Sequence, residues 1–162
     1  MFRKIFGMMA VLGLVVFWSG CSRTPEISGD PKQRLTDYVT KSFAVKQFQD
    51  REQLLSYMTG DVKRRLESWS EDQFRDAFLN SKRTLSKITI REVKPISDDE
   101  TQITYELIYN EIKKEVDGQM IEAKVTNKKL CQMLRAEHGR WYISDVKNIK
   151  ELIEFNNSLS LP

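Results

Sequence analysis

The chain of 162 residues is poor in the side chains that most often build catalytic and metal centres, with one histidine and two cysteines. Cys21 and Cys131 lie far apart in the sequence, and with a single histidine they provide no credible zinc site. Glycine and proline are also scarce, and no internal repeat or low-complexity tract is present. The length fits one domain, and no cofactor is expected.

Acidic residues are missing from residues 1–20, where Arg3 and Lys4 are the only charged side chains. Without this segment the formal net charge falls from +3 to +1, because these two cations are lost with it. A nearly neutral body has no basic excess of the kind that attracts nucleic acid. We therefore expect no nucleic-acid partner.

An apolar run of 14 residues, 5–18, follows Arg3 and Lys4 and contains no charged or strongly polar side chain. Roughly 20 apolar residues are needed to span the hydrocarbon core of a bilayer, so this run is short for a permanent membrane span. Its length is that of the apolar region of a signal peptide. Two small residues, Ser19 and Gly20, then precede Cys21.

This order of cations, apolar run, small residues and cysteine resembles a bacterial lipoprotein signal. The resemblance implies that residues 1–20 are a signal peptide and that the thiol of Cys21 is lipidated. It implies a protein anchored by acyl chains, palmitate among them, in the bacterial cell envelope and facing the periplasm, and Ser22 favours the outer membrane. The alternatives are an ordinary cleaved signal and an uncleaved anchor in the inner membrane. If Cys21 is acylated, Cys131 has no disulfide partner.

Residues 21–30 are polar, carry Pro25 and Gly29, and are predicted to be a flexible tether between the lipidated cysteine and the domain. Residues 31–162 form the predicted single domain.

Helical spacing dominates the first half of this domain. Asp30 and Pro31 suit the start of a helix predicted over residues 31–46. The apolar stripe of this helix recurs at every fourth position, at Leu35, Val39 and Phe43. A second helix is predicted from Asp50 to Gly60. Another opens at Ser70, which forms a capping-box pattern with Gln73.

After Asn80 the apolar period changes from about four to two, which predicts strands. The predicted strands cover residues 84–95, 100–115, 119–136 and 140–147, with hairpin turns at Gly118 and Gly139. A change of alternation at residues 127–129 indicates a bulge, and a short helix is predicted near residues 148–157. The predicted fold class is α+β, with N-terminal helices packed on a curved four-stranded antiparallel meander sheet and a short C-terminal helix.

The helix-to-meander order and the ending from Arg140 to Val146 resemble the nuclear transport factor two-like (cystatin-like) superfamily. The ending is similar to the pattern Gly-x-Trp-x-Ile-x-x-Val of small bacterial members. The resemblance implies a cone-like domain in which helices pack into the concave side of a long sheet. It leaves function open, because the superfamily includes isomerases, dehydratases, transport adaptors and domains without known activity.

Three tyrosines are the candidate pocket residues. Tyr105 and Tyr109 share a predicted strand face, and Tyr38 lies on the first helix. Their phenols either point into a ligand pocket or belong to the core with hydroxyls near its rim, and the sequence favours the core. His138 is expected in an exposed turn. No Asp or Glu is placed at an inward strand position, so no catalytic residue is predicted.

The favoured function is therefore non-enzymatic: a lipid-anchored envelope domain that binds a hydrophobic ligand or a protein partner, with a homodimer through the sheet as one form of partner. The rival is a small isomerase- or dehydratase-like enzyme that uses a tyrosine and a carboxylate in the cone. Trp69 is interpreted as a core anchor and Cys131 as a small buried hydrophobe. The run Lys128-Lys129 is interpreted as a solvated face, with contact to anionic lipid as the alternative.

Overall fold

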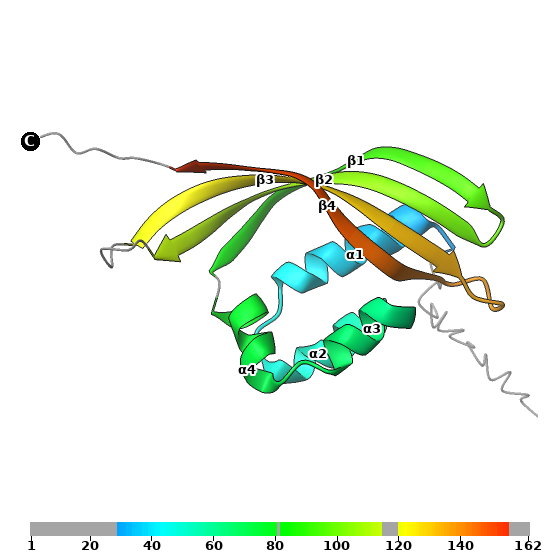
Figure 1. The fold of residues 1–162 in the computed structure, drawn as a ribbon, viewed down its shortest axis with the longest axis horizontal. Helices are drawn as coiled ribbons and strands as arrows, with labels where there is room; N and C mark the ends of the chain where they lie inside the picture. Colours follow the sequence, from blue (N-terminus) through cyan, green and yellow to red (C-terminus); the bar gives the residue numbers. More distant parts are fainter. Residues whose placement is uncertain (1–28, 81, 115–119, 156–162) are drawn as a thin grey trace, which may run out of the picture.

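The structure, a computed structural model, describes residues 29–80, 82–114 and 120–155. The predicted signal peptide, Cys21 and most of the predicted tether lie outside the described residues. Within them, a helical layer is followed by four long strands in the order β1-β2-β3-β4, each antiparallel to its neighbour (Figure 1). The predicted α+β class and the predicted meander are confirmed.

Helix α1 (Pro31–Phe43) starts as the sequence predicts. The carboxylate of Asp30 accepts a hydrogen bond from the backbone N–H of Lys32 at 3.0 Å, and Pro31 occupies the first turn. Leu35 and Val39 are buried on the face toward the sheet. The apolar stripe therefore fixes α1 beneath the sheet as the central element of the core.

Five short segments follow α1 and form the rest of the helical layer: η1 (Phe48–Asp50), α2 (Arg51–Leu55), α3 (Gly60–Glu67), α4 (Glu71–Phe74) and the π-helical turn η2 (Arg75–Leu79). The predicted capping box is present at the start of α4. The Ser70 N–H donates to the Gln73 side chain at 2.9 Å, and the Gln73 N–H donates to the Ser70 hydroxyl at 3.2 Å.

The prediction that the second helix runs to Gly60 is wrong, because α2 ends at Leu55 and Gly60 begins α3. The intervening backbone pairs with β4 instead of continuing the helix. The Thr59 N–H donates to the Ile143 carbonyl at 2.9 Å, and the Ile143 N–H donates to the Tyr57 carbonyl at 2.9 Å. Gly60 has a φ of +60°, which lets the chain turn from this pairing into α3.

The four strands are β1 (Arg83–Ser97), β2 (Glu100–Lys114), β3 (Met120–Arg135) and β4 (Trp141–Phe155). The predicted turn at Gly139 is confirmed, with a φ of +83°. The turn predicted at Gly118 lies outside the described residues. Strands of 15 or 16 residues are long, so the sheet twists and curves over the helical layer (Figure 1).

The predicted C-terminal helix at residues 148–157 is wrong in the part that the structure describes. Residues 148–155 continue β4 and pair with residues 123–129 of β3. The apolar spacing of three and four residues, which is typical of a helix, has a different origin here. Ile149 is an extra residue without a partner in the ladder, and it resets the alternation of β4.

The bulge predicted at residues 127–129 falls at the correct place in the sheet but in the neighbouring strand. The pairing between β3 and β4 is irregular between Lys128 and Lys129, and the extra residue is Ile149 of β4. Strand β3 itself keeps its odd-numbered residues on the helix side throughout. Leu130 and Leu134 therefore lie on the outer face, and no shift of parity occurs in β3.

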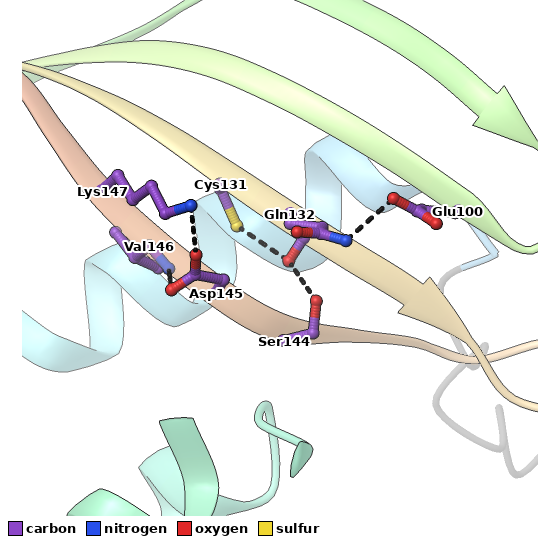
Figure 2. A network of polar contacts seen from close by, with 7 residues as sticks. All are labelled: Glu100, Cys131, Gln132, Ser144, Asp145, Val146 and Lys147. Atoms are coloured by element: carbon purple, nitrogen blue, oxygen red, sulfur yellow. Dashed lines mark hydrogen bonds and ion pairs between the residues drawn. The ribbon is translucent and has the colours of Figure 1, made fainter. Parts of the chain in front are cut away.

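A second bulge lies at Ser144 of β4, and a polar network surrounds it (Figure 2). The Ser144 hydroxyl donates to the backbone carbonyl of Gln132 at 3.1 Å, and the Gln132 side-chain amide donates to Glu100 at 2.8 Å. The carboxylate of Asp145 pairs with Lys147 at 3.2 Å. These contacts join β2, β3 and β4 where the ladder is interrupted, so they stabilise the local bend.

The described helices all lie on one side of the sheet (Figure 1). A homodimer through the sheet, one of the partners that the sequence leaves open, would cover the other side. Among the described residues no helix covers it; Leu130 is half-buried there and Leu134 is 38% exposed. A homodimer through this face stays a prediction. In residues 29–80, 82–114 and 120–155, no helix is long and apolar enough to cross a membrane.

Candidate functional site

A cavity of about 290 Å³ lies between the helical layer and the concave face of the sheet. Helix α1 forms one wall, β2 with flanking residues of β1, β3 and β4 forms the opposite wall, and Trp69, Ala77 and Phe78 also line it. Six aromatic side chains line it: Tyr38, Phe43, Trp69, Phe78, Tyr105 and Tyr109. Such a wall suits an apolar or aromatic ligand.

The structure brings the three candidate tyrosines together on this one cavity. Tyr105 is 2% exposed and Tyr109 is 8% exposed, so both are core residues as well as wall residues. The Tyr109 ring packs against Phe43, with ring centroids 5.3 Å apart. The sequence left open whether these tyrosines line a pocket or belong to the core. The structure places them in both, because the core residues between α1 and the sheet also form the cavity wall.

Burial widens the pH range over which these phenols stay neutral. It raises the pKa of Tyr38 to about 12 and the pKa of Tyr105 well above its usual value, with the nearby Cys131 acting in the same direction. Burial also raises the pKa of Tyr109, and the charges of Glu111 and Glu151 add to this effect. Neutral phenols present a hydroxyl that can donate or accept a hydrogen bond.

Two cationic side chains also line the cavity, Arg83 at the start of β1 and Lys129 in β3. The guanidinium of Arg83 donates to the backbone carbonyl of Ala77 and lies over the Phe43 ring, 5.6 Å from its centroid. It also forms a hydrogen bond with the Tyr109 side chain. Arg83 is thereby held against the wall by a backbone carbonyl, an aromatic ring and a phenol, all of which are uncharged.

Lys129 corrects the interpretation of the Lys128-Lys129 run as a solvated face. Lys128 is exposed on the outer face, whereas Lys129 is half-buried on the helix side, between the inward residues Asn127 and Cys131. Burial lowers the pKa of Lys129, the charge of Arg83 lowers it further, and the charge of Glu151 opposes this. Strand alternation separates these neighbours in sequence onto opposite faces.

The described part of the cavity wall contains no carboxylate. The rival enzymatic hypothesis needs one within hydrogen-bond reach of Tyr105 or Tyr109. The expectation of no inward Asp or Glu is wrong for Glu111, which shares the odd-numbered inner face of β2 with Tyr109. The charges of Glu111 and Glu151 both raise the pKa of Tyr109, and the Glu151 carboxylate accepts a hydrogen bond from the Asn127 side chain at 2.6 Å. The titratable groups of the described wall are three phenols, one guanidinium and one ammonium.

His138 lies in the exposed turn between β3 and β4, as expected, and its Nε2 is 3.2 Å from the Tyr142 hydroxyl. Cys131 is completely buried, and burial raises the pKa of its thiol to about 12. Its thiol therefore stays protonated and unreactive at neutral pH. No cluster of three metal-ligating side chains occurs among the described residues.

Several wall residues escaped the sequence analysis. Trp69, interpreted as a core anchor, is half-buried at the cavity, with its ring 6.2 Å from that of Phe78. Arg83 lies one residue before the strand predicted at 84–95. Because it was left outside the strand, the sequence pattern did not assign it to the inner face. For Lys129 a signal was present, since it shares odd parity with Val125 and Cys131.

No protein-family model matches the chain, and no curated protein matches it. Among solved structures, the chain is similar to the intermembrane space region of the chloroplast protein ARC6, with a TM-score of 0.51 and 15% sequence identity over 72% of this chain and 94% of that chain. This likeness shows a shared fold.

Two further similar structures have lower scores. One is an NTF2-like protein involved in plasmid conjugation, with a TM-score of 0.49 and 5% identity over 75% of this chain and 46% of that chain. The other is a computationally designed 17-OHP binder, with a TM-score of 0.39 and 18% identity over 75% of this chain and 96% of that chain.

Proposed function

We propose that this protein is a lipid-anchored, non-enzymatic binding domain of the bacterial cell envelope, with a nuclear transport factor two-like cone that holds a small hydrophobic molecule. The observation that carries the binding proposal is the cavity between α1 and the sheet, with aromatic side chains on its walls. Its volume of about 290 Å³ is near the lower end of roughly 300–1,000 Å³ that is usual for small-molecule sites.

The composition of the wall supports binding of an apolar ligand. Aromatic faces bury a large apolar area and lose little conformational freedom on contact, because each ring has only two rotatable side-chain bonds. The phenol of Tyr38, which lines the cavity, adds a hydrogen-bonding group for orienting the ligand. A few polar groups in an otherwise apolar cavity are the usual source of orientation and specificity.

The anchoring proposal rests on the sequence from Arg3 to Cys21. A single acyl chain contributes about 0.8 kcal/mol per buried methylene and gives only marginal membrane binding, so two or three chains on Cys21 are needed for lasting attachment. Residues 21–30 then act as the tether that presents the cavity to the periplasm, at the outer membrane.

Isothermal titration of the full-length acylated protein in lipid nanodiscs tests the binding proposal, with empty nanodiscs as the blank. The probes are neutral compounds of suitable size, phenylacetamide and octanamide. Ala77→Leu extends a side chain into the cavity that Ala77 lines. We expect it to weaken probe binding at least about tenfold, since displaced ligand atoms lose their apolar contacts.

Thr40→Leu is the matched control, because it introduces the same side chain on the exposed face of α1. This variant should bind the probes as the natural protein does. Binding that Ala77→Leu leaves unchanged, or a natural protein that binds neither these neutral probes nor their carboxylates, contradicts a ligand site in this cavity.

A further inference from the structure

The described part of the cavity wall has an excess of positive charge, which a purely apolar ligand would not neutralise. Arg83 and Lys129 both line it, and the described part of the wall holds no acidic side chain. The two cations come from strands that β2 separates in the sheet, yet they are close enough for the charge of Arg83 to act on Lys129. Their long side chains therefore converge on one space.

Placing two cations together beside apolar walls costs free energy twice. Each cation gives up hydration, and each repels the other in surroundings of lower dielectric than water. A structure that needed only an apolar cavity would use neutral residues at both positions. Two inward-pointing cations are favourable when an anion occupies the space between them for part of the protein's working life.

The nearby protein groups do not supply an anion between Arg83 and Lys129 inside the cavity. Arg83 donates to a neutral backbone carbonyl, that of Ala77, and lies over an aromatic ring. Glu151 moderates Lys129 through its charge, but its carboxylate is bound by Asn127 and it is absent from the described wall. Glu111 pairs with Arg83 in the sheet, and its charge raises the pKa of Tyr109. It is likewise absent from the described wall.

We propose that the ligand of this cavity is a small amphipathic carboxylate, with its anionic group bound by Arg83 and Lys129 and its apolar body packed on the aromatic wall. This inference rests on the proposed function and names the ligand class. Arginine presents a fork of N–H donors that matches a carboxylate, and lysine adds a compact positive charge. The cavity volume fits one aromatic ring or a short acyl chain with its carboxylate.

The test compares carboxylates with their uncharged amides on the full-length acylated protein in nanodiscs by isothermal titration. The probes are phenylacetate against phenylacetamide, and octanoate against octanamide, so that the two arms separate an aromatic acid from an acyl chain. The natural protein should bind at least one carboxylate about 10- to 100-fold more tightly than its amide, the range expected for hydrogen bonds to charged groups.

Lys129→Gln should remove most of that preference, and Lys128→Gln, its exposed neighbour on the outer face, should keep the full preference. Arg83→Gln is a second variant with the same expected loss; because Arg83 also contacts Ala77 and Phe43, its folding is checked by circular dichroism. The preference should also shrink with added salt.

The outcomes separate this inference from the proposed function. Equal binding of acids and amides, unaltered by Lys129→Gln, overturns the carboxylate assignment while the cavity stays a binding site. Tighter binding of the acid that Lys129→Gln and Arg83→Gln leave intact overturns it as well. The absence of any binding, neutral or anionic, contradicts both.

Discussion

The phenol groups of the cavity show how burial sets the chemistry of single residues. Tyr38 faces the cavity from α1, and Tyr105 faces it from β2. Both have pKa values raised by burial, to about 12 for Tyr38. A phenolate loses hydration in such a place, so the stability linked to the raised pKa is present only while each phenol remains protonated.

The pH dependence of stability follows from the sign of this shift. A group whose pKa is higher in the folded than in the unfolded protein stabilises the fold below the unfolded value, about 10 for tyrosine. That contribution disappears as the pH rises through the folded value of about 12. The free energy of unfolding should therefore fall between these pH values, and Tyr38→Phe should reduce the fall by about 2 kcal/mol.

Urea unfolding followed by circular dichroism at pH 9 and pH 11.5 measures this loss. Tyr142→Phe is the control, because Tyr142 lies at the last hairpin and not among the described wall residues. A loss of stability equal in the natural protein and Tyr38→Phe means that the Tyr38 phenol is not protected by the fold.

At the scale of elements, the start of α4 lies within the segment from Trp69 to Phe78, whose two ends line the cavity. Ser70 and Gln73 satisfy each other's backbone N–H groups there, directly after Trp69 and before Ala77 and Phe78. Without the cap, the first turn of this short helix has no internal replacement for these hydrogen bonds. The cap thus helps to position wall residues that are themselves distant from it.

Ser70→Ala should lower the free energy of unfolding by about 1 kcal/mol, the usual cost of removing a serine N-cap. Chemical unfolding compared with Ser68→Ala, an exposed serine just after α3, provides the measurement. A Ser70→Ala, Gln73→Ala double-mutant cycle then tests the reciprocal bond, which predicts less than the sum of the single losses. A Ser70→Ala loss no larger than that of Ser68→Ala argues against the cap in solution.

The order of the elements could be predicted from the sequence because local chemistry marks their starts and their apolar periods. Asp30 with Pro31, and Ser70 with Gln73, cap the helices as predicted. The last strand could not be predicted beyond residue 147. Its extra residue, Ile149, changes the period of two into intervals that are also typical of a helix. Bulges depend on pairing with another strand, which a single segment does not reveal.

Of the candidate site, the sequence predicted the tyrosines but not the two cationic residues. Tyr105 and Tyr109 follow from the alternation of β2, whereas Arg83 and Lys129 escaped because charged side chains are usually assigned to solvent. Long basic side chains can bury their apolar stems and direct their charged ends into a cavity. The contribution of Trp69 depends on how α3 and α4 turn beneath the sheet, and this is set by packing between distant segments.

At the scale of the whole molecule, the proposed anchor decides where the cavity operates. Cys21→Ser removes the thiol that would accept the acyl groups, so the variant should lose its fatty-acid modification and its association with the envelope. Mass spectrometry of the mature N-terminus and fractionation of cells provide the measurement. A variant that still matures and fractionates with envelopes contradicts the lipoprotein proposal, and an intact Met1 in the natural protein favours an uncleaved anchor.

The pairing of Tyr57 and Thr59 with Ile143 has a consequence for how this molecule behaves in a crowded compartment. The edge strands of an open sheet have unpaired backbone N–H and C=O groups, with which a strand of another chain can pair. Here the beginning of β4 is already occupied by the protein's own backbone. The protein's own backbone therefore blocks growth of an intermolecular sheet from that end of β4.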